Sequence, residues 1–180
     1  MSDVLLTDNT LFDKLDTHKK GLKHYAFSVF LFNIKGEFLL QKRATNKYHS
    51  GGLWSNTCCS HFRNVDEFNN KEKTAKNRLQ EELGVDFKGS LNFVDVFEYN
   101  EKVNNGLIEN EVDYIFTGLI DDDIVAIREK INKNEAEDVD FIDLEGLKYD
   151  INNNSHKYTK WFYLMMNDKS LLKKITKSLQ

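Results

Sequence analysis

The chain contains no proline among its 180 residues and only two cysteines, Cys58 and Cys59. Without proline, one of the two residues that most often mark loops is missing, so element boundaries have to be predicted from hydrophobic periodicity. Because the cysteines are adjacent, they cannot form a long-range disulfide with each other. A free thiol pair is typical of a reducing compartment, so the cysteine usage predicts a cytoplasmic protein.

Long apolar runs and a positive net charge are absent as well. The longest strongly apolar run, Val29-Phe30-Leu31-Phe32, is far shorter than the roughly 20 residues that cross a bilayer. The first residues show neither the basic nor the apolar region of a secretory signal. The net charge of -4 provides no global field that attracts nucleic acid. We therefore expect no membrane or nucleic-acid partner, and any bound anion needs a local cluster of basic residues.

What is present is enough apolar material for one domain spanning residues 1–180, with 40% hydrophobic residues and 13 phenylalanines. Periodicity predicts strands at residues 25–33, 37–42, 91–99, 112–119 and 139–142. It predicts helices at 71–83, 155–166 and 171–179, and a weak helix or turn at 121–132. Strands interleaved with helices, without regular alternation, predict an α/β (α+β) fold with a mixed sheet between helices.

The most informative segment is Trp54-Ser55-Asn56-Thr57-Cys58-Cys59-Ser60-His61. In an extended backbone alternate side chains share a face, so the Cys59 thiol and the His61 imidazole lie on the same side. Glu109 and Glu111 have the same spacing and the same consequence. If the two segments face each other, a thiol and two carboxylates meet beside a metal site. Cys58 is expected to be a buried apolar residue, as free cysteines usually are.

Histidines supply the second set of candidates. His18, His24 and His61, combined with Glu109 and Glu111, make a nitrogen and oxygen set suited to a transition metal, although their separations in the sequence are irregular. A single histidine is more often structural or solvated than a ligand. His49 and His156 have no companions in the sequence, and we expect them to be ordinary residues.

On the predicted 71–83 helix, Arg78 and Glu82 are four residues apart and share a face away from the stripe of Ala75, Leu79 and Leu83. Spacing alone leaves two interpretations open. One is a solvated ion pair, which contributes little to stability. The other is a site for phosphate and metal, with Glu82 holding a hard cation such as Mg²⁺.

Together these segments resemble type 1 isopentenyl-diphosphate isomerases, a branch of the Nudix fold. The most similar parts are residues 24–33, Lys42-Arg43-Ala44, residues 54–61, residues 78–84 and Glu109-Asn110-Glu111. The resemblance implies a Nudix-like mixed sheet between helices. It also implies an enzyme of isoprenoid biosynthesis that interconverts isopentenyl and dimethylallyl diphosphate. Protonation and deprotonation would pass through a tertiary carbocation.

The resemblance also implies residue roles. Cys59 resembles the catalytic thiol, Glu111 the carboxylate across the substrate, Tyr99 the tyrosine that assists it, and Trp161 the indole that faces the cation. Five residues resemble the ligands of a divalent metal, which could be Mn²⁺, Zn²⁺ or Mg²⁺: His18, His24, His61, Glu109 and Glu111. Glu82 resembles the residue that helps bind Mg²⁺ on the diphosphate. The residues that resemble diphosphate ligands are Lys14, Arg43, Lys47 and Arg78. Two departures are Phe62, where the family usually has proline, and the segment at residues 48–52.

Two alternatives belong to other classes. A Nudix pyrophosphohydrolase would resemble Arg-Glu-aliphatic-any-Glu-Glu-any-Gly across the catalytic helix, but here Asn77-Arg78 replaces the opening Arg-Glu and removes a metal carboxylate. A non-catalytic module that binds diphosphate or metal would not need Cys59 and Glu111 together. The isomerase hypothesis is therefore favoured over both.

Overall fold

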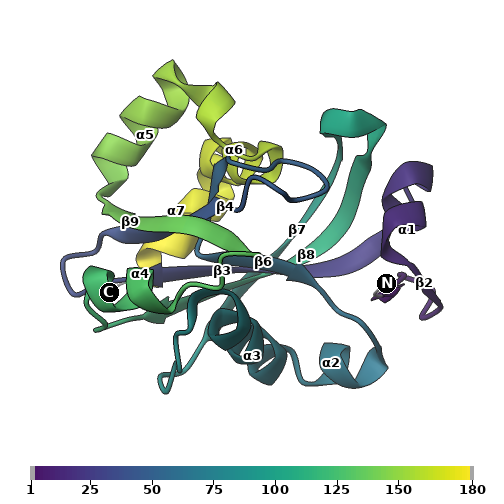
Figure 1. The fold of residues 1–180 in the computed structure, drawn as a ribbon, viewed down its shortest axis with the longest axis horizontal. Helices are drawn as coiled ribbons and strands as arrows, with labels where there is room; N and C mark the ends of the chain where they lie inside the picture. The colour runs from purple at the N-terminus through teal and green to yellow at the C-terminus, as the bar shows by residue number, and fades with distance from the viewer. Residues whose placement is uncertain (1–2, 179–180) are drawn as a thin grey trace.

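The structure is a computed structural model, and it describes residues 3–178. Figure 1 shows a central sheet with α2 and α3 on one side and α5, α6 and α7 on the other. The strands are β1 (Asp3–Leu5), β2 (Leu11–Asp13), β3 (His24–Phe32), β4 (Phe38–Arg43), β5 (Trp54–Ser55), β6 (Cys58–His61), β7 (Asn92–Lys102), β8 (Ile108–Leu119) and β9 (Ala136–Ile142). The α-helices are α1 (Lys14–Lys20), α2 (Val65–Asn69), α3 (Lys71–Leu83), α4 (Ile124–Lys130), α5 (Leu144–Asn153), α6 (Lys160–Asn167) and α7 (Lys169–Lys177). Two 3₁₀ turns are η1 (Asn104–Gly106) and η2 (Ser155–Lys157).

Strand β3 lies at the centre of the main sheet. It pairs in parallel with β8 along its whole length, and on its other edge it pairs antiparallel with β6 and, at Phe32, with β4. The remaining strands extend the sheet outward, with β7 beside β8 and with β5 and β9 beside β4. The mixed sheet between helices that the sequence predicts is confirmed.

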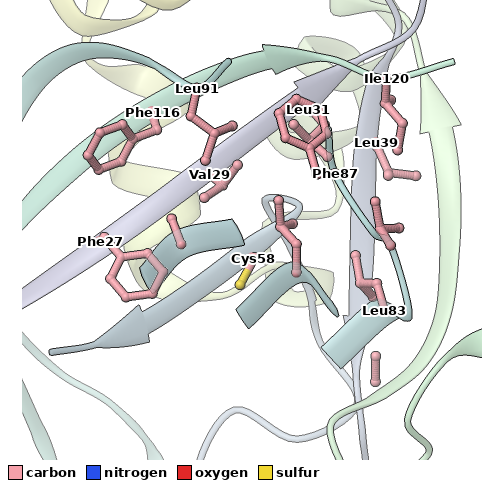
Figure 2. Packing of buried hydrophobic residues seen from close by; sticks show 14 of the residues in the cluster. Phe27, Val29, Leu31, Leu39, Cys58, Leu83, Phe87, Leu91, Phe116 and Ile120 are labelled. Carbon is pink, nitrogen blue, oxygen red and sulfur yellow. The ribbon is translucent and has the colours of Figure 1, made fainter. Parts of the chain in front are cut away.

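The two faces of β3 bury two separate cores, because side chains alternate along a strand. Phe27, Val29 and Leu31 pack with Leu79 and Leu83 of α3, and Figure 2 shows part of this cluster. The other face contributes Phe30 and Phe32 to a second cluster. Residues of α5, α6 and α7 complete this cluster: Leu147, Trp161, Phe162, Met165, Leu171 and Ile175. Toward its beginning, this second face of β3 carries His24, Ala26 and Ser28 instead of large apolar residues.

The predicted 71–83 helix is confirmed as α3, including its end. Gly84 follows with φ of 67°, in the left-handed region where glycine is favoured, and its N–H bonds to the Gln80 carbonyl. A Cβ at Gly84 would also lie 2.5 Å from Lys130 Cβ, so tertiary packing reinforces the local preference. The predicted strands and the 121–132 and 171–179 segments correspond to β3, β4, β7, β8, β9, α4 and α7, with shifted ends; Leu179 lies outside the described residues.

The prediction of one helix over residues 155–166 is wrong. The segment begins as η2 and becomes helical again only in α6, because Tyr158 and Thr159 are extended. The Thr159 N–H bonds to the Trp54 carbonyl, and Tyr158 forms a parallel bridge with Trp54. A long-range pairing therefore overrides the local helical pattern. The sequence analysis also left α1 and α5 without a prediction.

No helix among residues 3–178 is both long and apolar enough to cross a bilayer.

Candidate active site

The site lies where β6, β3 and β8 run side by side. In the strand register, Cys59 is opposite Ser28 and His61 is opposite Ala26, while His24 is paired with Glu111. The alternation predicted for the two short motifs is therefore realised across three neighbouring strands. The structure brings Cys59, His61 and both glutamates to one pocket.

Five residues converge at one end of this pocket. One ligand atom from each of His18, His24, His61, Glu109 and Glu111 lies within 4.8 Å of the corresponding atoms of the others. His18 Nε2 is 3.1 Å from Glu109 Oε2, and His61 Nε2 is 2.8 Å from Glu111 Oε1. His24 Nε2 is 3.5 Å from Glu111 Oε1. The geometry thus gathers the whole predicted ligand set.

This five-residue cluster has the features of a divalent-metal site. Its atoms His18 Nε2, His24 Nε2 and Glu109 Oε2 are buried and have no hydrogen-bond partner, which is costly unless something binds them. The opposite ring nitrogens are directed by backbone carbonyls: His18 Nδ1 is 2.5 Å from Lys14 O, and His24 Nδ1 is 2.8 Å from Leu22 O. Such contacts orient metal-binding imidazoles. The mixture of imidazole and carboxylate donors suits a transition ion.

The two buried glutamates are ionised at neutral pH, and their negative charges favour the binding of a cation. Burial alone would raise the pKa of Glu109, but contacts with His18, His49 and His61 hold that pKa well below its usual range. Burial and the neighbouring Glu109 would likewise raise the pKa of Glu111, but contacts with His24 and His61 lower it. Burial lowers the pKa of His61 and so favours its neutral form. Ionised carboxylates and neutral imidazole bind metal, so the shifts of Glu109, Glu111 and His61 favour binding. For His24, burial lowers the pKa but Glu111 and Glu109 raise it above its usual value.

The two cysteines point to opposite faces of β6. Cys58 is fully buried in the cluster beside α3, and Figure 2 shows its sulfur among apolar side chains. Cys59 lies on the other face, where its sulfur is within 4.8 Å of carboxylate oxygens of Glu111 and Asp113. Burial raises the pKa of the Cys59 thiol well above its usual value, and the charges of Glu111 and Asp113 add to the effect.

Two aromatic residues complete this end of the pocket. The Tyr99 hydroxyl donates to Glu111 Oε2, so the two side chains form one unit. Trp161 lines the pocket, is 2% exposed, and donates from Nε1 to Ser55 Oγ at 3.1 Å. The Arg43 guanidinium lies 5.1 Å from its ring centroid. The indole therefore presents a face to a cation.

Four basic residues line the same pocket. Lys14, Arg43, Lys47 and Arg78 come from α1, β4, the loop after β4 and α3, and all four line the pocket. Burial lowers the pKa of Lys14, and the positive charge of Lys47 lowers it further. Cations that destabilise one another in a buried place are expected to bind an anion, because an anion relieves their repulsion. We call these residues the basic cluster.

Glu82 is the acidic group of this region. It is 4% exposed, and its carboxylate accepts hydrogen bonds from Arg78 at 2.5 Å and from Gln41 at 3.0 Å. The interpretation of Arg78 and Glu82 as a solvated ion pair is therefore wrong, because both line the pocket. Gln41 and Glu135 also line the pocket, and Glu135 pairs with Lys47. Neither residue was predicted from the sequence, because neither belongs to a recognisable local motif.

His49 is the main correction to the sequence analysis. We expected an ordinary histidine, yet it is 3% exposed, lines the pocket, and has its Nε2 2.8 Å from Glu109 Oε1. Burial lowers the pKa of His49.

Asp113 and Ser28 are two further polar residues of the site that were not predicted. Ser28 Oγ donates to Asp113 Oδ2 at 2.8 Å, and Ser28 is paired with Cys59 in the sheet. The alternation that places Glu109 and Glu111 on one face of the strand continues to Asp113. This alternation could have predicted Asp113 from the sequence.

Comparison with known proteins defines the class first. The family model described as NUDIX domain matches residues 22–162. Among solved structures, a MutT protein from Methanosarcina mazei Go1 is similar with a TM-score of 0.58 and 14% identity, over 87% of this chain and 94% of that one. A NUDIX hydrolase from Nitrosomonas europaea has a TM-score of 0.56 and 9% identity, over 87% and 90%. At these identities the structures show the fold alone.

Sequence relatives then narrow the class. The chain is 43% identical to isopentenyl-diphosphate Delta-isomerase 1 of Aromatoleum aromaticum, over 82% of this chain and 78% of that protein. It is also 43% identical to isopentenyl-diphosphate Delta-isomerase 2 of Photorhabdus laumondii, over 86% and 81%, and 40% identical to the isomerase of Serratia proteamaculans over the same shares. The chain belongs to the isopentenyl-diphosphate Delta-isomerase family within the NUDIX fold.

Proposed function

We propose that this chain interconverts isopentenyl and dimethylallyl diphosphate, a reaction of isoprenoid biosynthesis. The observation that carries the proposal is the convergence of the Cys59 thiol and the Glu111 carboxylate on one pocket that four basic residues also line. Moving a double bond requires one proton to be added to an alkene carbon and another to be removed from an allylic carbon. A thiol and a carboxylate on one pocket can perform both transfers.

The basic cluster is assigned to the diphosphate. Arginine forks and lysine ammonium groups neutralise phosphate oxygens, and Arg78 also contacts Glu82. Glu82 is assigned to a Mg²⁺ that accompanies the diphosphate, since carboxylate oxygen is the ligand that this ion prefers. With its charged head held there, the five-carbon tail extends toward Cys59, Glu111 and Trp161.

Cys59 and Glu111 exchange roles with the direction of the reaction. Toward dimethylallyl diphosphate, one group protonates the terminal alkene carbon, and the other removes a proton from the allylic carbon, which is the second carbon from the ester oxygen. The reverse reaction uses each group in the opposite sense. Two van der Waals contacts across a flat carbon unit need about 7 Å. The thiol and carboxylate are within 4.8 Å, so substrate binding has to turn at least one of these side chains.

Trp161 is assigned to the carbocation that forms between the two transfers. An indole face contributes about 2 kcal/mol or more to a desolvated cation. Enzymes lower barriers by roughly 8–23 kcal/mol, so this contact alone is too small. Positioned proton transfer has to supply much of the rest. Burial of Trp161 and Tyr99 also keeps water away from a cation that water would quench.

The histidine and glutamate cluster is assigned to a divalent transition ion, with His18, His24, His61, Glu109 and Glu111 as the residues that would hold it. When bound, such an ion supplies positive charge that fixes the Glu111 carboxylate and lowers its basicity. Tyr99 holds the same carboxylate from the other oxygen. Glu111 is thereby oriented from two sides.

Exchange with solvent tests the reaction directly. With Mg²⁺ and isopentenyl diphosphate in D₂O, the purified chain is expected to place deuterium in dimethylallyl diphosphate, because the added proton comes from an exchangeable side chain. Mass spectrometry or NMR of the product measures the incorporation. Release of phosphate or pyrophosphate without isomer would instead identify a hydrolase.

The hydrolase alternative is disfavoured by the acidic groups of α3. Among the residues that the structure describes, the two clusters with metal-ligand geometry contain no carboxylate of that helix. Glu82 is engaged by Arg78 and Gln41, and Glu81 is largely exposed at 44%. A helix that presents one buried carboxylate is poorly suited to assembling several Mg²⁺ ions for hydrolysis.

Removal of metal is expected to abolish isomerisation reversibly. Protein treated with a strong chelator and returned to Mg²⁺ alone should stay inactive if the cluster needs a transition ion, and Mn²⁺ or Zn²⁺ should restore turnover. Atomic absorption of the protein before and after treatment identifies the ion and its stoichiometry. Full activity of a protein shown to hold no divalent metal in the cluster would contradict the assigned ligand set.

A further inference from the structure

The two oxygens of Glu109 face different neighbours. Oε2 points into the five-residue cluster, 3.1 Å from His18 Nε2 and 3.9 Å from His24 Nε2, and has no hydrogen-bond partner. Oε1 points the other way, 2.8 Å from His49 Nε2. This contact is close but lacks the alignment of a full hydrogen bond, so a donation from His49 to Glu109 requires the imidazole to turn. His49 thus holds the oxygen that the metal cluster does not use.

The other ring nitrogen of His49 sets the tautomer. Ser50 Oγ lies 3.2 Å from Nδ1, and a hydroxyl that donates to Nδ1 leaves the proton of a neutral imidazole on Nε2. That proton then faces Glu109. In this tautomer His49 has a donor 2.8 Å from a carboxylate oxygen, and metal-binding groups usually have hydrogen-bonding partners of this kind in their outer shell.

The loop around His49 is held by Arg43 at the end of β4 and by the distant turn η1. Arg43 donates to the His49 and Ser50 carbonyls at 3.2 and 3.1 Å. From η1, Asn104 Oδ1 accepts the Ser50 N–H at 2.8 Å. Ser50 has φ of 51°, a conformation that residues other than glycine rarely adopt. A conformation of this kind persists only where surrounding contacts determine it, so the position of the imidazole is imposed on the loop.

His49 is not part of the cluster whose ligand atoms all lie within 4.8 Å of one another. Its ring also packs edge-on against Trp161, with centroids 5.9 Å apart. The imidazole therefore lies outside the ligand set, between a metal-binding carboxylate and the indole of the substrate pocket. A residue in this place is able to orient a ligand without being one.

We propose that His49 is a positioning residue of the metal centre, which donates from Nε2 to Glu109 Oε1 and restricts Glu109 to binding the ion through Oε2. The proposal rests on the metal site described under the proposed function. It assigns a role in metal affinity to a histidine outside the motifs of the sequence. Removing a partner of this kind typically lowers metal affinity 10–100-fold.

The test measures metal binding rather than turnover. Chelator-treated protein is titrated with Zn²⁺ against a chromophoric competitor, for the unaltered chain and for His49→Gln, His49→Phe and His49→Ala. His49→Gln keeps a donor, whereas His49→Phe keeps the ring and its packing against Trp161 without a donor. His156→Ala is the matched control, since His156 is exposed on η2.

The expected result is a loss of Zn²⁺ affinity of about 10–100-fold in His49→Phe and His49→Ala, with His49→Gln and His156→Ala close to the unaltered chain. Thermal unfolding of the metal-free proteins checks the fold. If His49→Ala does not fold, the Zn²⁺ affinities of His49→Gln and His49→Phe decide the test.

Unchanged Zn²⁺ affinity in His49→Phe would overturn the proposal. An equal loss in Gln and Phe, with one nitrogen fewer in the spectrum of the Co²⁺ adduct, would make His49 a ligand and overturn it too. If the unaltered chain binds no Zn²⁺, the metal assignment fails together with this inference, whereas unchanged affinity in the variants leaves that assignment standing.

Discussion

Replacing Cys59 by alanine is expected to lower isomerisation by about 10³-fold or more, because positioned acid–base groups typically contribute 10²–10⁴-fold and no other thiol faces the pocket in the described residues. The methyl group of alanine can neither donate nor accept a proton. The fold should remain, since Cys59 lies at the edge of its apolar cluster rather than inside it. Deuterium incorporation into dimethylallyl diphosphate measures the rate, and circular dichroism checks the fold.

Cys58→Ser is the matched control for this experiment. The Cys58 thiol belongs to the core cluster beside α3 and does not line the pocket, and Figure 2 shows its sulfur among apolar side chains. Serine has nearly the same volume and keeps a hydroxyl donor near Glu82, whose charge acts on Cys58. We expect a loss of stability with turnover largely retained. Comparable rates for Cys59→Ala and the unaltered chain would remove Cys59 from the mechanism.

Glu111→Gln is expected to have a similarly large effect, a fall in turnover of about 10³-fold or more, through two physical causes. The carboxamide has almost the same shape, so Tyr99 keeps a partner, but it neither releases nor takes up a proton near neutral pH. It also replaces a charged metal ligand by a neutral one, so affinity for the divalent ion should fall. Product NMR in D₂O measures the first effect, and competition titration with Zn²⁺ measures the second.

Glu98→Gln provides the comparison for Glu111→Gln. Glu98 is on β7, opposite Val112 of β8. Its side chain is 59% exposed and forms an ion pair with Lys23 at 2.6 Å. Loss of such an exposed ion pair costs little, so rate and metal affinity should stay at the values of the unaltered chain. If Glu111→Gln isomerises as fast as Glu98→Gln, the proton transfer assigned to Glu111 is wrong, and another group has to be sought.

Local patterns predicted those parts of the fold in which neighbouring residues decide the structure. The stripe of Ala75, Leu79 and Leu83 with Gly84 after it predicted α3, because a helix and its end depend on residues within a few positions. The same reasoning failed at Tyr158 and Thr159. There a backbone bond to Trp54, far away in the sequence, replaces the helical one.

The candidate site divides in the same way. Spacing placed Cys59 with His61, and Glu109 with Glu111, because side-chain alternation is a property of any extended backbone. Resemblance to a family supplied Lys14 and Trp161 as site residues, because no local pattern of the sequence indicates them. Burial of Glu82 disagrees with a solvated ion pair, whereas the binding of phosphate and metal by Arg78 and Glu82 stays a prediction.

The sequence by itself determined which chemical groups this protein has and which of them share a face of a strand: a thiol with an imidazole, and two carboxylates. Only the tertiary structure decided that His49 approaches Glu109 while His156 stays exposed. The physical reason is that periodicity acts over a few residues, whereas the His49 loop is held by contacts with η1, more than fifty positions away along the chain.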